Sequence, residues 1–562
     1  MQVCTFFDLL TCHPSCAPID CSTPIHTLYI DFNFLLRLVF SRCVFENKKK
    51  EEMDEVIICD TLKYTLTLIN KTIKPTSSVV ISMDGPVPNV NLCKMREGLY
   101  KNVYDTYQET CIKQQNDPLY RGNIGGEYMH AFVGGTSFMQ KIVNRLHSMI
   151  NLNVFQNRNV IISASDEVGE GAIKILQHVR GNMHENHKIC IYGMDDKKTM
   201  MCLSNAITDV FFCNDMDHGV VNIGDAIVQW LMDNKLYEKY MYDKIQISND
   251  LVFIFMLCGN DVAPSIEFLR IRDQGWKYLI RTYVTCGVPI INAQDESIIW
   301  DNLIHFINEL SKLENVGLRK KYNKLLQRKL YGKSKPIGHE TQIQMYHDEY
   351  LINTHHPLHD QYCSIFEYID FRKPPHVWKP MYYQILFIGP SDINNIKFFC
   401  SDYLDSLLWC WEYYKYGHVA SWSYKYPHTV APTLSDFGRY FNEFRYLPRT
   451  YNVDILNGPL SPIAQLICIL PRTMNHLLPT CLRSDILSPS SLLSIHYPTN
   501  ELEIEFSLFT ASKIRYAVPK LPPYHLIHIQ HVCDARLSNF TTSELERNMF
   551  KPFVPPSCYR LI

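Results

Sequence analysis

The fold is decided by the stretch Lys188-Ile-Cys-Ile-Tyr-Gly-Met-Asp-Asp-Lys-Lys198, where a short apolar run ends at Tyr192-Gly193 and a carboxylate follows. The run is too short for a helix and lacks a 3.6-residue period, so it predicts a buried β-strand. Other short segments repeat this form, an apolar run that is closed by an acid. They are Thr27 to Asp31, Ser78 to Asp84, Asn159 to Asp166, and Leu251 to Asp261.

Helical stretches alternate with these strands, which predicts an α/β fold with a mostly parallel central sheet flanked by helices. Residues 94–115 have a helical pattern, and residues 134–139 and 169–174 each open a further helix. In an open parallel sheet the carboxyl ends of the strands line one crevice, so acids that close several strands converge there. The candidate acids are Asp31, Asp84, Glu170, Asp195 and Asp261.

These carboxylates point to one kind of chemistry. Several acids at one edge form the oxygen-rich environment that Mg²⁺ or Mn²⁺ prefers. Two such ions about 4 Å apart can activate water and stabilise the leaving oxygen of a phosphoryl displacement. The alternative for each acid alone is a helix cap, because Asp is common at the start of helices. No Gly-x-Ser-x-Gly elbow and no P-loop offers a competing site.

Composition limits the classes of protein to consider. The chain has 562 residues, 46% of them hydrophobic, which suffices for two to four domains or one large two-part body. The formal net charge of −2 gives no overall basic field, so a nucleic acid would have to be held by a local patch. The N-terminus lacks the basic region of a secretion signal, and no apolar run is long enough for a membrane span. We therefore expect a cytosolic or nuclear protein whose cysteines are thiols.

Three parts follow along the chain. We expect an α/β core over residues 1–290, a basic helical linker over residues 291–370, and a helical, loop-rich C-terminal region over residues 371–562. The segment from Lys312 to Lys335 contains nine basic residues and one acid, Glu314. This excess fits either a solvated helical linker or a patch that faces phosphates.

An ordered series of short motifs resembles the XRN-type 5′→3′ exoribonucleases. In the first half the motifs are Tyr29-Ile-Asp31-Phe-Asn33, Met83-Asp84-Gly85, Gly135-Thr136, Gly169-Glu170-Gly171, Tyr192-Gly193-Met-Asp195 and Gly259-Asn260-Asp261. In the second half Asp402 to Trp409, Ser421-Trp422, Tyr426-Pro427 and Ser543 to Asn548 continue the series. The short chain fits a compact, divergent member of this family, such as a virus or another streamlined genome would encode.

The resemblance implies a nuclease core of the PIN and flap-nuclease type and a hydrolase that uses two divalent ions. Its substrate would be single-stranded RNA with a 5′-monophosphate, and no small-molecule cofactor or membrane is implied. The five acids would hold the metal. The expected RNA contacts are a stacking surface at Trp422, with Tyr424 or Tyr414 beside it, stacking by Arg37, and backbone contacts. The backbone contacts would come from Lys94, Arg96 and Lys101.

Two departures from the family pattern put catalysis in question. The second glutamate of Gly-Glu-Gly-Glu is Ala172, and the second aspartate of Asp-x-Asp is Lys197. Both changes should weaken metal binding, through lost anionic charge and through repulsion. Asp196 or Glu167 could substitute for the missing acids. Three functions therefore stay open: an active 5′→3′ exoribonuclease, a catalytically weakened RNA-binding homologue, and a flap-type DNA endonuclease.

Overall fold

The computed structural model describes most of the chain around one central sheet. The described residues are 6–11, 24–43, 50–116, 128–152, 154–155, 158–182, 187–205, 210–213, 221–222, 230, 233, 244–331, 369–387, 392–444, 455–507 and 517–552. The second half of the predicted linker, residues 332–368, lies outside these ranges. Among the described residues no helix is both long and apolar enough to cross a membrane.

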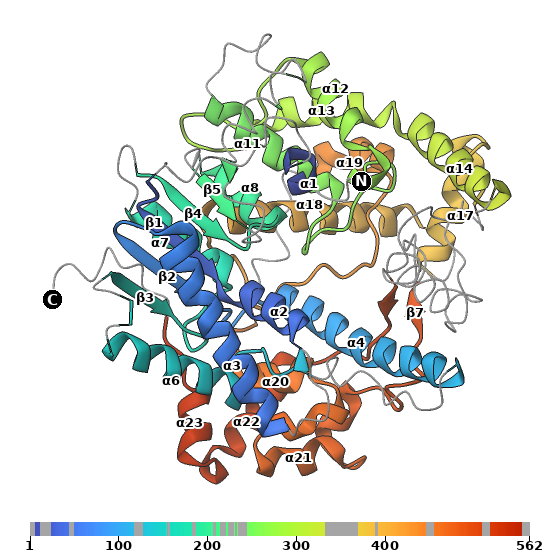
Figure 1. Ribbon diagram of the computed structural model, residues 1–562. Helices are drawn as coiled ribbons and strands as arrows, with labels where there is room; N and C mark the ends of the chain where they lie inside the picture. Colours follow the sequence, from blue (N-terminus) through green and yellow to red (C-terminus); the bar gives the residue numbers. More distant parts are fainter. Residues whose placement is uncertain are drawn as a thin grey trace.

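The central sheet has the order β3-β2-β1-β4-β5-β6, and only β6 runs antiparallel (Figure 1). Its strands are β1 (Thr27–Asp31), β2 (Ser78–Ser82), β3 (Asn159–Ser163), β4 (Ile189–Tyr192), β5 (Val210–Cys213) and β6 (Val221–Asn222). The last residues of β1, β2 and β3 are register partners: Asp31 pairs with Ser82, and Ser82 with Ser163. The residues that follow these strands therefore meet at one edge. The predicted α/β fold with a mostly parallel sheet is confirmed.

Helices cover both faces of the sheet, because alternate strand residues point to opposite faces. Leu28, Ile30, Val79 and Ile81 join one apolar cluster, which includes residues of α2 (Phe32–Arg42), α3 (Lys50–Thr67) and α6 (Ser137–Asn151). Tyr29, Val80 and Ile191 join the other, with residues of α7 (Gly171–Asn182), α8 (Asp196–Ser204), α11 (Lys244–Phe255) and α18 (Ile393–Tyr416). The second cluster continues through Ile291 and Leu303, across the predicted boundary near residue 290. The boundaries themselves stay a prediction.

One predicted strand is wrong. Residues 251–258 lie in the end of α11 and in the short helix η3 (Met256–Cys258), not in the sheet. All eight side chains from Leu251 to Cys258 are buried. A helix that is buried all round has the same continuous apolar pattern as a buried strand, so periodicity cannot separate the two.

The remaining elements support the site from two sides. The long helix α4 (Asn89–Asn116) packs on α20 (Pro462–Ile469), which belongs to a third apolar cluster with α21 (Thr480–Leu487) and α22 (Leu526–Ala535) (Figure 1). On the other side α18 packs on α8 and η3.

Further elements are α1 (Phe6–Thr11), η1 (Leu68–Ile73), η4 (Ile271–Asp273), α12 (Trp276–Cys286), α13 (Trp300–Ser311), α14 (Glu314–Tyr331), α17 (Pro375–Phe387), α19 (Leu434–Phe444), η6 (Arg472–Leu477), η7 (Leu492–His496), β7 (Phe506–Ser507), β8 (Val518–Pro519), η9 (Leu537–Asn539) and α23 (Thr542–Asn548).

Candidate functional site

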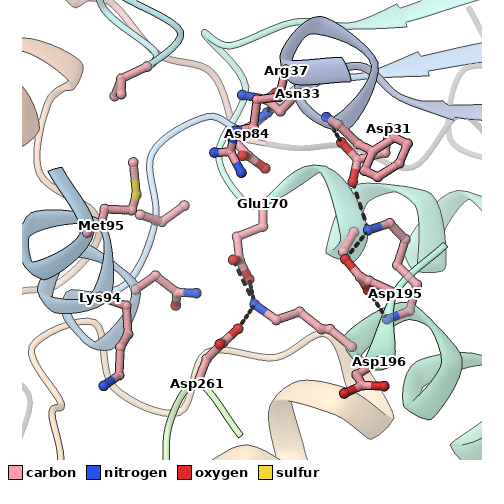
Figure 2. Close-up of a pocket in the computed structure, with 18 of the residues that line it drawn as sticks. Asp31, Asn33, Arg37, Asp84, Lys94, Met95, Glu170, Asp195, Asp196 and Asp261 are labelled. Atoms are coloured by element: carbon pink, nitrogen blue, oxygen red, sulfur yellow. Dashed lines mark hydrogen bonds and ion pairs between the residues drawn. The ribbon is translucent and has the colours of Figure 1, made fainter. Parts of the chain in front are cut away.

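A cavity of about 910 Å³ opens at the carboxyl edge of the sheet (Figure 2). All five acids predicted from the sequence line it, although they come from five separate segments of the chain. The other lining residues are Phe7, Asn33, Phe34, Arg37, Val87, Asn91, Lys94, Met95, Gly98, Leu99, Asn102, Met129, Val133, Ala172, Met194, Asp196, Lys197 and Lys198. The lining thus combines six carboxylates with four cationic side chains.

Asp31 and Asp195 are both helix caps and cavity acids. Asp31 Oδ1 accepts a hydrogen bond from the Phe34 amide at 3.0 Å, which caps α2. Asp195 Oδ1 accepts one from the Lys198 amide at 2.9 Å, which caps α8. Each cap uses one oxygen, and the Oδ2 atom of each acid contacts the Lys198 ammonium instead. The cap interpretation and the site interpretation of these acids are therefore compatible.

Lys198 bridges this first pair of acids. Its Nζ lies 2.7 Å from Asp31 Oδ2 and 2.5 Å from Asp195 Oδ2, and only 3% of its side chain is exposed. Burial alone would lower the pKa of Lys198, but the two carboxylates outweigh it and raise the pKa above its usual range. The ammonium is therefore a permanent positive charge between the two acids.

Lys197 bridges the second pair in the same way. Its Nζ lies 2.9 Å from Glu170 Oε1 and 2.9 Å from Asp261 Oδ2, and its pKa is raised because these two carboxylates outweigh its burial (Figure 2). Lys197 in turn holds the pKa of Asp261 below its usual value. The Tyr413 hydroxyl donates to Glu170 Oε2 at 2.7 Å. Burial raises the pKa of Glu170 despite these partners.

Asp84, the fifth acid, is held by backbone groups. Its Oδ1 accepts a hydrogen bond from the Gly171 amide at 2.8 Å, and its own amide donates to Asn33 Oδ1 at 2.9 Å. The next residue must be glycine, because a Cβ on Gly85 would stand 1.7 Å from the Glu167 carbonyl oxygen. No ion pair joins Asp84 to a lysine or arginine in the described part of the chain, and Figure 2 shows Asp84 beside Asn33.

The predicted RNA contacts divide into two groups. Arg37 and Lys94 line the cavity, and their contact with RNA stays a prediction. Lys101 does not line it and pairs with Asp105 at 2.6 Å. Arg96 is 4% exposed and donates to the carbonyl oxygens of Pro522 and His496, a placement at odds with contact to an RNA backbone.

The predicted aromatic surface is largely core. Tyr414 and Tyr424 are buried, and Tyr424 stacks on Trp409 with ring centroids 5.8 Å apart, so neither offers a face to a base. Trp422 is half-buried and does not line the cavity of the acids. The aromatic rings that do line it are Phe7 and Phe34, which sequence reasoning missed.

Neither proposed substitute replaces the missing acids fully. Asp196 lines the cavity at the first residue of α8, but its Oδ1 accepts a hydrogen bond from the Phe7 amide at 2.6 Å. Glu167 does not line the cavity and accepts a hydrogen bond from the Ser163 hydroxyl at 2.5 Å.

A pair of divalent ions does not fit among these side chains as they lie. An ion would have to stand between carboxylates from different segments. The Lys197 ammonium holds the position between Glu170 and Asp261, and the Lys198 ammonium holds the position between Asp31 and Asp195. In the described part of the chain no three His, Cys, Asp or Glu side chains come together as a metal site. The carboxylate oxygens are ligands that hard cations prefer. In this chain the ammonium groups of Lys197 and Lys198 supply positive charge beside them.

Sequence reasoning did not predict the contacts that three further side chains make at or beside the site. Lys198 and Tyr413 contact the acids, and Lys174 donates from Nζ to the carbonyl oxygens of Met83 and Ala164, at 2.9 and 2.8 Å. Lys174 is 1% exposed, and burial lowers its pKa to about 8. The signals available in the sequence were a lysine directly after Lys197 and the motif Tyr413-Tyr414.

The fold and the site together indicate which class of protein this chain belongs to. A parallel sheet that gathers five carboxylates at its carboxyl edge, over a cavity with cationic and aromatic walls, is typical of α/β phosphodiester-processing proteins. Two family models then match the chain, "XRN 5'-3' exonuclease N-terminus" over residues 1–214 and "Xrn1 helical domain" over residues 373–549. Together they cover more than half of it. The chain belongs to the XRN 5′–3′ exonuclease family, which confirms the resemblance.

Individual relatives agree with this assignment. Human 5'-3' exoribonuclease 1 is 24% identical over 84% of this chain and 30% of its own length. 5'-3' exoribonuclease 1 of Saccharomyces cerevisiae is 22% identical, over 84% and 39%. 5'-3' exoribonuclease 2 of Debaryomyces hansenii is 22% identical, over 94% and 67%. The chain thus spans about a third of the length of the first two relatives. None of these relatives supports a viral origin.

A solved structure of the catalytic core of Rad2 in complex with DNA is also similar. It covers 62% of this chain and 84% of its own, at 13% identity and a TM-score of 0.30. A TM-score this low does not establish a shared fold. The fold assignment therefore depends on the strand order and register described above.

Proposed function

We propose that the cavity receives the 5′ end of a single-stranded RNA and that the chain is a catalytically weakened 5′→3′ exoribonuclease. The observation that carries this proposal is the pair of lysine bridges, Lys197 between Glu170 and Asp261 and Lys198 between Asp31 and Asp195. A divalent ion could bind between either pair only by displacing a buried, doubly paired ammonium, and repulsion between like charges opposes its approach. All five predicted acids remain in the cavity, so we expect activity to be reduced rather than lost.

The walls of the cavity support RNA as the ligand. Lys94 is half-exposed and Arg37 is exposed, and both supply attraction to phosphates that does not depend on sequence. Phe7 and Phe34 offer aromatic faces, on which bases stack with about 1–3 kcal/mol each. The relatives named above are 5'-3' exoribonucleases, which makes a 5′-monophosphorylated RNA the first substrate to test.

The second candidate is a fully active exoribonuclease that uses two divalent ions. The observation that favours it is the gathering of all five predicted acids in one cavity. A flap-type DNA endonuclease is less favoured, because residues 373–549 match the helical domain of the XRN family.

One assay separates these candidates. Purified protein is incubated with 5′-monophosphorylated RNA, 5′-triphosphorylated RNA and flapped DNA, each in Mg²⁺, in Mn²⁺ and in excess EDTA. We expect slow nucleotide release from the monophosphorylated RNA only, at a rate that still rises at high metal concentration. Rapid release that saturates at low metal concentration would favour the second candidate. The Asp84→Ala variant is the control for a contaminating nuclease, and cleavage of flapped DNA alone would refute the proposal.

A further inference from the structure

The two lysine bridges have a geometry that loose surface lysines do not have. Each ammonium contacts carboxylates from two segments that are distant in sequence, with N–O distances from 2.5 to 2.9 Å. The side chains of Lys197 and Lys198 are only 14% and 3% exposed. Both are therefore fixed parts of the cavity wall.

The first turn of α8 positions both lysine side chains. Lys197 and Lys198 are neighbours in the first turn of α8, about 100° apart around its axis, so their side chains diverge and reach different pairs of acids. The Lys198 amide is also fixed by Asp195 Oδ1, and the Tyr413 hydroxyl holds the second oxygen of Glu170. The network leaves the bridged oxygens occupied (Figure 2).

The charge balance shows what the bridges do. Six carboxylates line the cavity, and without the two lysines only Arg37 and Lys94 would oppose them. An RNA phosphate entering such a site would meet a strong net negative charge, and in a metal-dependent site the divalent ions remove that repulsion. Here the two ammonium groups stand between the acids and lower the excess of negative charge from four units to two.

We infer that Lys197 and Lys198 replace two divalent cations as the permanent counter-charges of the cavity, so that RNA binds in it without divalent metal. This inference rests on the proposed RNA-binding function. It concerns binding only and adds no chemical step to it.

The test measures RNA binding and metal binding separately. A 5′-monophosphorylated single-stranded RNA with a 3′ fluorophore is titrated with the full chain, and anisotropy is recorded in excess EDTA and in millimolar Mg²⁺. For the wild-type chain we expect the two dissociation constants to agree within about twofold. For Lys197→Met with Lys198→Met we expect affinity in EDTA to fall at least about tenfold, because two positive charges leave the cavity, and to recover in Mg²⁺.

The controls keep the two proposals apart. Lys63→Met removes one exposed lysine of α3 and should change neither constant. Mn²⁺ binding, followed by electron paramagnetic resonance without RNA, should be weak in the wild-type chain and clear in the double variant. If the double variant does not fold, Lys197→Met alone keeps the Lys198 bridge and is measured instead.

Each remaining outcome decides the question. Loss of wild-type RNA binding in EDTA, or equal RNA binding by the double variant in EDTA, overturns the inference. Tight Mn²⁺ binding by the wild-type chain also overturns it. Absence of RNA binding in every condition refutes the proposed function instead, while the Mn²⁺ comparison still tests whether the lysines hold the cation positions.

Discussion

Restoring the two missing acids should convert the cavity into a metal site. The perturbation is Ala172→Glu with Lys197→Asp, which makes the cavity more negative by one unit at residue 172 and by two at residue 197. Ala172 is 8% exposed and lines the cavity in the first turn of α7, so a glutamate there can reach the acids. Asp at 197 removes the ammonium that stands between Glu170 and Asp261.

The size of the effect follows from these charges. At an effective dielectric constant of 20, a unit charge 4 Å from a divalent ion interacts with it by about 8 kcal/mol. Asp261 is 56% exposed, so solvent screens most of this energy, and we keep about a sixth of it for each unit. A sixth is about 1.3 kcal/mol, or roughly tenfold in affinity. Three units therefore predict an increase of about a thousandfold in metal affinity.

The assay is Mn²⁺ titration by calorimetry, followed by RNA turnover at low Mg²⁺ concentration. Lys63→Asp is the matched control, because it makes the same change of two charge units on exposed α3. We expect tight Mn²⁺ binding and faster turnover in the double variant only. A double variant that is folded by circular dichroism but binds Mn²⁺ no more tightly than the wild-type chain would refute the electrostatic reasoning.

Three further predictions concern RNA affinity and stability. Lys94→Ala should weaken RNA binding uniformly across sequences and reduce the salt dependence by about one phosphate contact; an unchanged slope in anisotropy titrations would place Lys94 outside the RNA path. Burial raises the pKa of Asp250 to about 6, so its folded state keeps a proton that the unfolded state releases, and stability should fall by about 3 kcal/mol as the pH rises from 4 through 6. Asp250→Asn should flatten that fall in thermal melts, and a melting curve that keeps it would assign the effect to another group. Gly85→Ala should lower the free energy of unfolding by about 1–3 kcal/mol, because its Cβ meets the Glu167 carbonyl. Gly98→Ala should raise the free energy of unfolding, because a Cβ there meets open space within α4. Equal effects of the two variants would contradict the steric argument.

The strand-end acids could be predicted from the sequence because parallel strands in register end at one edge. Asp31, Asp84 and Asp195 each follow a short apolar run, and that local pattern suffices to bring them together. Asp261 reached the same cavity although the run before it is helical, because both a helix and a strand carry the chain to that edge. The fold class was therefore within reach of sequence reasoning, but the type of one element was not.

The cations and aromatic rings of the site could not be predicted in the same way. The ammonium of a lysine lies several bonds from the backbone, so its position depends on which acids the fold places nearby, and Lys198 gave no sign of its partner. Tyr414 and Tyr424 are of the residue type that forms RNA-stacking surfaces, but both are buried in the apolar cluster that contains α18. The sequence alone does not distinguish an aromatic residue that is buried in the core from one that binds a ligand.

The hydrogen bond from Tyr413 to Glu170 has a consequence for how the chain is made. The two residues are 243 positions apart in the sequence. At about 5–20 residues per second, a ribosome adds Tyr413 roughly 12–50 s after Glu170. For that interval α18 is missing from its face of the sheet, and Glu170 lacks both its hydroxyl partner and its cover. The nascent chain therefore completes the hydrogen bonds of Glu170 late, well after the strands of the sheet have been synthesised.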